Sequence, residues 1–288
     1  MPDQQERPVF TFPSSDGTTI HVRSWLPADP RGIVQIAHGM GEHSERYGHL
    51  AERLAELGYA VYADDHRGHG HSMGEIPGDL GPDGWNLLVA DEVALTGILR
   101  ERHPGLPLTL FGHSLGSFAV QQYLLDHSSL IDEAVLCGTT AVDGLFAEMA
   151  AAGGDLTAYF NAGFQPTRTD ADWISRDEAQ VDAYLADPWC GFAIDEANMG
   201  LLAATASTRL SNPGTIRTDL PIYVMVGDKD PLNAGLRLSD LLVRRYRDAG
   251  LTDITYQVYP DARHEVLNEL QRDEVEADLL AWVTRARV

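Results

Sequence analysis

The chain has 288 residues, 44% of them hydrophobic, which fits one large globular domain or one domain with an insertion. Its 21 basic and 43 acidic side chains give a formal charge of −22, so we expect neither nucleic acid nor anionic membrane surfaces among its partners. No apolar run approaches the roughly 18 residues of a transmembrane helix, and residues 1–10 lack the basic start and apolar stretch of a signal peptide. These features predict a cytoplasmic protein without stable membrane insertion.

Apolar runs of strand length alternate with amphipathic helical stretches in the first half of the chain. Residues 9–12 and 18–25 flank a turn signal, Ser-Ser-Asp-Gly, and predict an antiparallel hairpin. The elements expected next are strand 33–37, helix 47–57, strand 59–63, helix 85–100, strand 108–111, a helix to about residue 126 and strand 134–137. This alternation is typical of an α/β fold with a mostly parallel central sheet flanked by helices.

The regular pattern is interrupted between residues 139 and 217. This stretch is rich in Ala, Gly and Asp, and it predicts helical pieces without a convincing strand. Alternation resumes with strand 222–226, helix 236–249, strand 254–259 and a last helix at 265–285. We therefore expect a core made of residues 1–138 and 218–288, with residues 139–217 inserted as a helical cap.

The strongest chemical signal is Gly112-His113-Ser114-Leu115-Gly116, which lies between a buried strand and a helix. This context is typical of the nucleophile elbow of the α/β-hydrolase fold. A serine on such a tight turn requires nearly side-chain-free residues two positions before and after it, and Gly112 and Gly116 meet that requirement. The pattern predicts Ser114 as a catalytic nucleophile.

A serine hydroxyl is a weak nucleophile, so it needs a base, and the base needs an acid to orient it. In this fold the chain order is Ser, then Asp or Glu, then His. Asp230 follows the strand 222–226 and His264 follows the strand 254–259, where open α/β sheets place their sites. We predict Asp230 and His264 as the other two catalytic residues, and Asp228 and Asp143 remain rival candidates for the acid.

An acyl-transfer intermediate carries an oxyanion that needs at least two fixed donors. The backbone N–H of Leu115, beside the nucleophile, is one candidate. The second candidate is the N–H of Met40, because the loop His38-Gly39-Met40-Gly41 follows an early strand and its glycines let the backbone approach a substrate. We expect these two N–H groups to form the oxyanion hole.

The histidines and cysteines do not predict a metal site. Six of the eleven histidines lie between His38 and His71, but His66, His69 and His71 occupy a turn-rich loop without helical spacing or a cysteine partner. Loop packing and hydrogen bonding explain them better. Two isolated cysteines are no disulfide framework, and we expect two thiols. No flavin or nucleotide motif is present, so we expect no cofactor.

Two further motifs carry a family resemblance. Residues 38–47, HGMGEHSERY, resemble the oxyanion-loop motif of the monoacylglycerol lipase and lysophospholipase-like branch of the α/β-hydrolases, and residues 65–72, DHRGHGHS, resemble its second signature. The resemblance spans nearly the whole chain except the cap. It implies Ser114, Asp230 and His264 as the triad, an oxyanion hole at Met40 and Leu115, and a lipophilic acyl tunnel under the cap. Many relatives carry a smaller residue at the position of Met40. We interpret the charged residues of the first motif as bracing the loop.

The substrate class follows less directly. The cap holds eight aromatic residues that can line an acyl pocket or pack the cap onto the sheet, namely Phe146, Tyr159, Phe160, Phe164, Trp173, Tyr184, Trp189 and Phe192. We expect a small-molecule ester substrate: a monoacylglycerol, a lysophospholipid or a similar lipophilic ester.

Three different functions also fit the sequence. A short-chain carboxylesterase would use the same chemistry, and an aminopeptidase would need a carboxylate cluster in the cap, for which Asp170, Asp172, Asp177 and Glu178 are candidates. A non-catalytic binding protein on the same fold is the third. The sequence indicates neither the specific substrate nor the oligomeric state.

Overall fold

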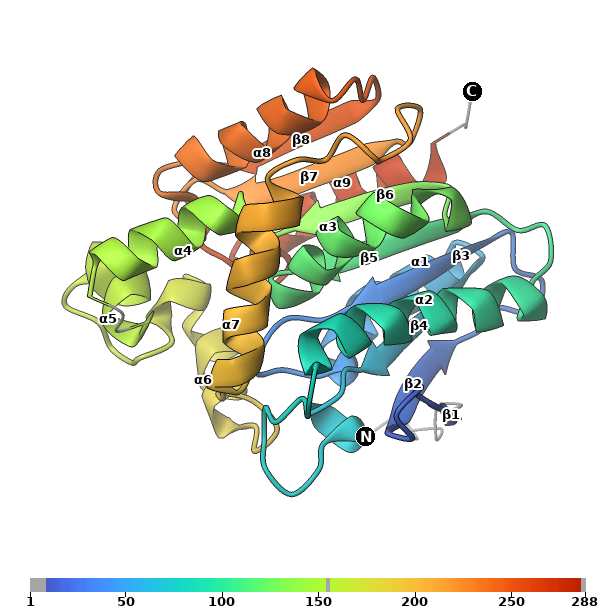
Figure 1. Ribbon diagram of the computed structural model, residues 1–288, viewed down its shortest axis with the longest axis horizontal. Coiled ribbons are helices and arrows are strands. Elements are labelled where there is room, and N and C mark those ends of the chain that lie inside the picture. The colour runs from blue at the N-terminus through green and yellow to red at the C-terminus, as the bar shows by residue number, and fades with distance from the viewer. Residues whose placement is uncertain (1–8, 154–155, 286–288) are drawn as a thin grey trace.

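The computed structural model describes residues 9–153 and 156–285. Its eight-stranded sheet has the order β1-β2-β4-β3-β5-β6-β7-β8 (Figure 1). The strands are β1 (Val9–Pro13), β2 (Thr19–Trp25), β3 (Gly32–Ala37), β4 (Tyr59–Asp65), β5 (Leu108–His113), β6 (Glu133–Cys137), β7 (Ile222–Gly227) and β8 (Ile254–Tyr259). β1 and β2 form the predicted antiparallel hairpin, β2 pairs antiparallel with β4, and β3 to β8 run parallel to one another. The predicted mostly parallel α/β sheet is confirmed.

Helices cover both faces of this sheet. α1 (Gly48–Glu56) and α9 (Arg272–Thr284) bury apolar residues such as Leu54 and Leu279 in the core on one face. On the other face, α2 (Gly84–Arg102), α3 (Leu115–His127) and α8 (Arg237–Asp248) pack into a larger core (Figure 1). With both faces covered, β3 to β7 are buried along their whole length, which explains why they read as continuous apolar runs. Within the two described ranges, no helix has the length and apolar character to cross a bilayer.

Residues 139–217, called the helical segment below, connect β6 to β7. Their helices are α4 (Val142–Ala151), α5 (Leu156–Asn161), α6 (Glu178–Ala186) and α7 (Glu196–Thr205), and the described part of the segment contains no strand. Asp177 and Asp195 cap α6 and α7 by accepting hydrogen bonds from N–H groups of the first turn. The four helices gather beyond one end of the sheet, on the left of Figure 1.

Two expected helices begin later than their sequence pattern predicts. The helix expected from residue 47 begins at Gly48, after a 3₁₀ turn at Ser44–Tyr47. The helix expected at residues 265–285 begins only at Arg272, as α9, so the prediction is wrong for residues 265–271. Tertiary contacts hold that stretch in another shape: the Glu265 N–H donates to the carbonyl of Ile174 at 2.7 Å, and the Glu265 carboxylate binds Arg46.

Candidate active site

Ser114 occupies a strained turn between β5 and α3. Its backbone has φ 50° and ψ −120°, a left-handed conformation that a residue with a side chain rarely adopts. A Cβ atom on Gly116 would lie 2.2 Å from the carbonyl oxygen of Ala37, and one on Gly112 would lie 2.6 Å from the carbonyl oxygen of Gly116. The steric demand for glycine on both sides of Ser114, expected from the sequence, is therefore present.

His264 and Asp230 meet at the carboxyl ends of β8 and β7. The Nδ1 atom of His264 lies 3.0 Å from Oδ2 of Asp230, and both residues are buried. The two rival acids form different contacts, since Asp228 pairs with a lysine and Asp143 with an arginine. The structure thus brings His264 to Asp230, 34 residues away in sequence, rather than to either rival.

The second ring nitrogen of His264 remains without a hydrogen bond among the described residues. This atom, Nε2, is buried, and it lies in a ring that lines the same cavity as Ser114. Burial favours the neutral ring, but the charge of Asp230 and its hydrogen bond outweigh burial, so the pKa of His264 lies above its ordinary value of 6.5. The rings of His113 and Trp173 lie 4.9 and 5.0 Å from that of His264 and hold it in place.

The loop that carries Met40 is braced by Glu42. One carboxylate oxygen of Glu42 accepts from the Gly39 N–H and from the Tyr47 hydroxyl, and the other accepts from Arg46. Arg46 also forms a two-point ion pair, at 2.9 and 2.7 Å, with Glu265, the neighbour of His264. The bracing predicted for the charged residues of this motif is confirmed by these contacts.

Both predicted oxyanion donors lie at the cavity. Leu115 is the first residue of α3, where N–H groups have no partner within the helix, and Met40 stands between Gly39 and Gly41. Gly41 has φ 62°, and a Cβ there would lie 2.2 Å from the carbonyl oxygen of Phe192 in the helical segment. Met40, in the loop after β3, and Leu115, in α3, thus line the same cavity as Ser114 from two different elements.

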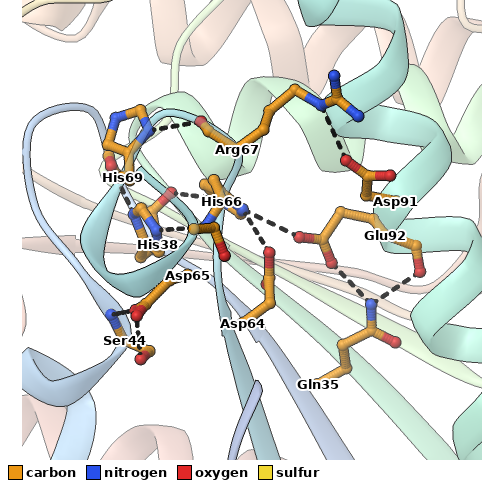
Figure 2. A network of polar contacts seen from close by, with 12 residues as sticks. Gln35, His38, Ser44, Asp64, Asp65, His66, Arg67, His69, Asp91 and Glu92 are labelled. Carbon is orange, nitrogen blue, oxygen red and sulfur yellow. Dashed lines mark hydrogen bonds and ion pairs between the residues drawn. The ribbon is translucent and has the colours of Figure 1, made fainter. Parts of the chain in front are cut away.

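A buried polar network holds the first residue of that loop, His38 (Figure 2). His66 lies 2.9 Å from Asp64 and 3.3 Å from Glu92 through Nδ1, and its Nε2 lies 3.0 Å from the carbonyl oxygen of His38. A carbonyl oxygen can only accept, so Nε2 of His66 carries a proton, and Nδ1 faces the two carboxyl groups. Burial opposes a positive charge on the ring, but Asp64 and Glu92 outweigh burial and hold the pKa of His66 well above 6.5.

His38 is the neutral counterpart of His66. Its Nε2 accepts from the backbone N–H of His66 at 3.0 Å, and its Nδ1 donates to the carbonyl of Gly39 at 2.7 Å. The two rings stack with centroids 3.9 Å apart, and burial together with the charge of His66 keeps the pKa of His38 well below 6.5. His69 is also buried, whereas His71 is exposed and packs on Trp189. Packing and hydrogen bonding therefore account for this histidine-rich loop, as expected.

Ser114 and His264 open into a cavity of about 470 Å³ between the sheet and the helical segment. Most of its lining is apolar. Five of the eight aromatic residues considered from the sequence contribute to it: Phe146, Phe160, Trp173, Tyr184 and Phe192. The remaining three, Tyr159, Phe164 and Trp189, pack elsewhere. Some of the eight aromatic residues thus line the cavity and others pack against protein side chains, the two roles that the sequence left open.

The acidic residues considered for an aminopeptidase do not gather at this cavity. Asp170 lines it, but Asp172 binds Thr169 and the Arg168 N–H. Asp177 caps α6, and the Glu178 side chain is 79% exposed beside Arg168. The structure therefore brings one carboxylate of the four to the cavity rather than a cluster.

Sequence reasoning missed the partners of His66. Glu92 is 1% exposed and lies on the buried face of α2, one turn from Leu88 and Leu95. A carboxylate among the apolar positions of an amphipathic helix was the available signal, because buried charges are paired. The pairing of Arg46 with Glu265 was also missed, and no local pattern indicates it, since the two residues are 219 positions apart.

Known proteins resemble this chain over nearly its whole length. The profile of the family described as serine aminopeptidase, S33, matches residues 28–271. The monoacylglycerol lipase of Mycolicibacterium smegmatis is 35% identical over 96% of this chain and 97% of that protein. The monoglyceride lipase of Mus musculus is 28% identical over 94% of this chain and 88% of that protein. Among solved structures, a thermostable carboxyl esterase from Bacillus coagulans has a TM-score of 0.82 and 29% identity, covering 96% of this chain and 97% of that one.

Proposed function

The chain belongs to the serine aminopeptidase S33 family and is a hydrolase of the monoacylglycerol lipase and esterase group, and on that premise we propose that it cleaves lipophilic carboxylic esters through an acyl-enzyme on Ser114. The substrates are monoacylglycerols, lysophospholipids or similar esters with one acyl chain. The observation that carries the proposal is the hydrogen bond of His264 to Asp230, with Nε2 of His264 left without a partner among the described residues and with Ser114 lining the same cavity.

The proposed reaction has two halves. Nε2 of His264 takes the Ser114 proton as Oγ attacks the ester carbonyl, and the imidazolium then gives that proton to the leaving alcohol as the ester C–O bond breaks. Water next loses a proton to His264 while its oxygen attacks the acyl-serine, and the proton returns to Ser114 as the fatty acid leaves. Asp230 orients His264 and stabilises its charged form in both halves.

The proposed oxyanion hole consists of the N–H groups of Met40 and Leu115. These donors act without rearrangement only if the loop 38–47 is held still, because catalysis by fixed dipoles depends on preorganisation. Glu42 fixes the loop from within by accepting from the Gly39 N–H. His66, from the neighbouring loop, fixes it by donating to the His38 carbonyl. Both are therefore proposed as positioning residues.

The shape of the cavity supports a lipophilic acyl group. Apolar side chains of α4 and α5, such as Met149 and Leu156, extend the lining away from Ser114. Burying an acyl chain there gains about 0.8 kcal/mol for each CH₂ group removed from water. Rates are therefore expected to rise with chain length until the cavity is filled.

An acyl-chain-length series tests the proposal. Initial rates are measured on p-nitrophenyl esters and 1-monoacylglycerols of two to eighteen carbons, with the Ser114→Ala protein as the blank. Maximal rates at medium or long chains that vanish in the variant are the expected result. A maximum at two to four carbons without monoacylglycerol turnover would replace the lipase proposal by a short-chain carboxylesterase, and rates insensitive to the variant would overturn Ser114.

The wild-type and Ser114→Ala proteins also distinguish an esterase from a binding protein and from an aminopeptidase. A fluorophosphonate probe is expected to label wild-type protein and not the variant, and failure to label the folded wild type would indicate a non-catalytic binding protein. Peptide p-nitroanilides are expected to be poor substrates, because Asp170 is the one carboxylate of the four candidates at the cavity. Faster turnover of these amides than of esters would favour an aminopeptidase.

A further inference from the structure

A second cavity, of about 590 Å³, lies on the outer side of the loop 38–47 and shares no lining residue with the first. Its polar lining consists of Arg23, His43, Glu45, His71 and Asp187, with Trp189 beside them. None of these groups takes part in the proposed ester cleavage. The cavity lies between that loop and the end of α6.

Three side chains of metal-ligating types converge at this place. A ring nitrogen of His43, a carboxylate oxygen of Asp187 and the sulfur of Cys190 all lie within 4.8 Å of one another. Nε2 of His43 is 2.9 Å from Oδ2 of Asp187, although the residues are 144 positions apart. His43 is buried, while the Asp187 side chain is 30% exposed and so gives an ion access from solvent.

We propose that His43, Asp187 and Cys190 form a binding site for Zn²⁺ or a similar divalent transition-metal ion. Imidazole, thiolate and carboxylate are the ligand types that zinc selects in proteins. Tetrahedral bonds of about 2.0–2.3 Å place ligand atoms about 3.3–3.6 Å apart, so small side-chain shifts suffice here. Water from the second cavity completes the coordination.

A different close trio of such residues, Asp64, His66 and Glu92, lacks the feature that matters for an ion. Both nitrogens of His66 already have fixed partners, and all three side chains are at most 3% exposed. That trio is therefore enclosed by protein, and an ion has no access to it from solvent. The His43 side chain has one hydrogen-bond partner among the described residues, Asp187, and lines the open second cavity.

Charge and proton balance fit a divalent ion. The ion takes the place of the hydrogen between His43 and Asp187, the ring proton of His43 then lies on Nδ1, and the Cys190 thiol proton is released to solvent, so that carboxylate, thiolate and ion together are neutral. Burial raises the pKa of Cys190 to about 12, and the thiol proton must therefore be displaced on binding. Affinity is accordingly expected to increase with pH.

The position of the site gives it a consequence for the neighbouring loop. The Gly191 N–H donates to the Gly41 carbonyl at 3.0 Å, and Phe192 lies against Gly41. An ion bound by His43 on one side and by Asp187 and Cys190 on the other fastens the helical segment to the loop that holds Met40. We expect the ion to stabilise the fold.

Cobalt titration of reduced, metal-free protein tests the site independently of ester hydrolysis. One equivalent of Co²⁺ is expected to give a sulfur-to-cobalt charge-transfer band in the near ultraviolet, and Zn²⁺ is expected to displace it. The Cys190→Ser variant is expected to lose the band, and Asp187→Asn to weaken binding at least tenfold. Asp182→Asn changes an exposed acidic residue of α6, five positions before Asp187, that pairs with Arg168; it is the matched control and is expected to bind normally.

Thermal unfolding provides the second measurement. Zn²⁺ at a hundredfold excess over its Kd is expected to raise the Tm of wild type and Asp182→Asn by about 5 °C, and to leave that of Cys190→Ser unchanged. Absence of one-equivalent binding, or a bound ion without the charge-transfer band, would overturn the site. Equal binding by Cys190→Ser or Asp187→Asn would overturn it as well, and two separate variants keep the test valid if one fails to fold.

Discussion

The two regions that face each other across the first cavity are built in opposite ways. On one side, the loop 38–47, which lines the cavity, and the adjoining loop 64–72, which does not, are largely buried, and hydrogen bonds such as those of Glu42 and His66 connect their polar groups. On the other side, the helical segment presents mostly apolar side chains to the cavity and exposes much of its remaining surface to solvent. Directional bonds fix atoms in the loops, whereas apolar contacts in the helical segment depend on volume more than on angle.

This difference divides the expected roles. In the proposed mechanism, stabilising an oxyanion requires donors held to a fraction of an ångström, and we expect the braced loop 38–47 to supply one of them. Selecting among acyl chains requires a surface whose volume can change without loss of the fold, and we expect the helical segment to supply it. Substitutions in the loops should therefore act on kcat, and substitutions in the helical segment should act on the preferred substrate.

The largest effect is expected for Ser114→Ala. Loss of the nucleophile should lower kcat by at least about 10⁴-fold, because the members of a triad act as one unit. The apolar lining is untouched, so binding of a lipophilic ester should be unchanged, as measured by equilibrium binding of a labelled monoacylglycerol. An equal loss of binding would mean that catalysis and substrate binding are not divided between the two regions.

The next effect is expected for His66→Gln. Without the His66 ring, Asp64 and Glu92 lose their shared partner and the His38 carbonyl loses its donor, so the Met40 N–H should shift. Misplacement of this kind can cost about 100-fold in rate. We expect kcat to fall about 10- to 100-fold with little change in KM, measured well below the Tm of the variant. A change confined to KM, or to Tm, would assign His66 a purely structural role.

A smaller and selective effect is expected for Met149→Trp in α4. The larger ring should fill part of the first cavity and lower kcat/KM for long acyl chains about tenfold, since one methylene in an apolar pocket can change rates by 10-fold or more. Rates on two-carbon esters should remain the same. Ala150→Trp, which adds the same ring on the exposed side of α4, is the control. Equal losses on short and long esters would show that this region also determines kcat.

The smallest effect is a shift of the pH profile. His264 must be neutral to accept a proton, and its pKa lies above 6.5, so kcat/KM should rise with pH through a midpoint above that value. The negative charge of Glu265 contributes to the raised pKa, and Glu265→Gln should therefore move the midpoint to lower pH. A wild-type midpoint below 6.5, or a shift to higher pH in the variant, would show that another group limits the rate.

Most of the sheet could be predicted from sequence because its signals are local. Strands buried on both faces, such as β4 and β5, appear as unbroken apolar runs, and the glycines around Ser114 reflect a steric requirement within five residues. The prediction failed at residues 265–271. There a helical pattern is overruled by contacts of Glu265 with Ile174 and Arg46, which lie far away in the chain.

The sequence by itself determined the order of the elements, the turn at Ser114 and the candidates for its partners, because periodicity and glycine placement act over a few residues. Only the tertiary structure decided that His264 contacts Asp230 rather than Asp228, and that His66 lies between Asp64 and Glu92. It also decided that potential ligand atoms of His43, Asp187 and Cys190 lie within 4.8 Å of one another. Such contacts depend on the relative positions of separate elements, which the packing of the whole core sets and no local pattern records.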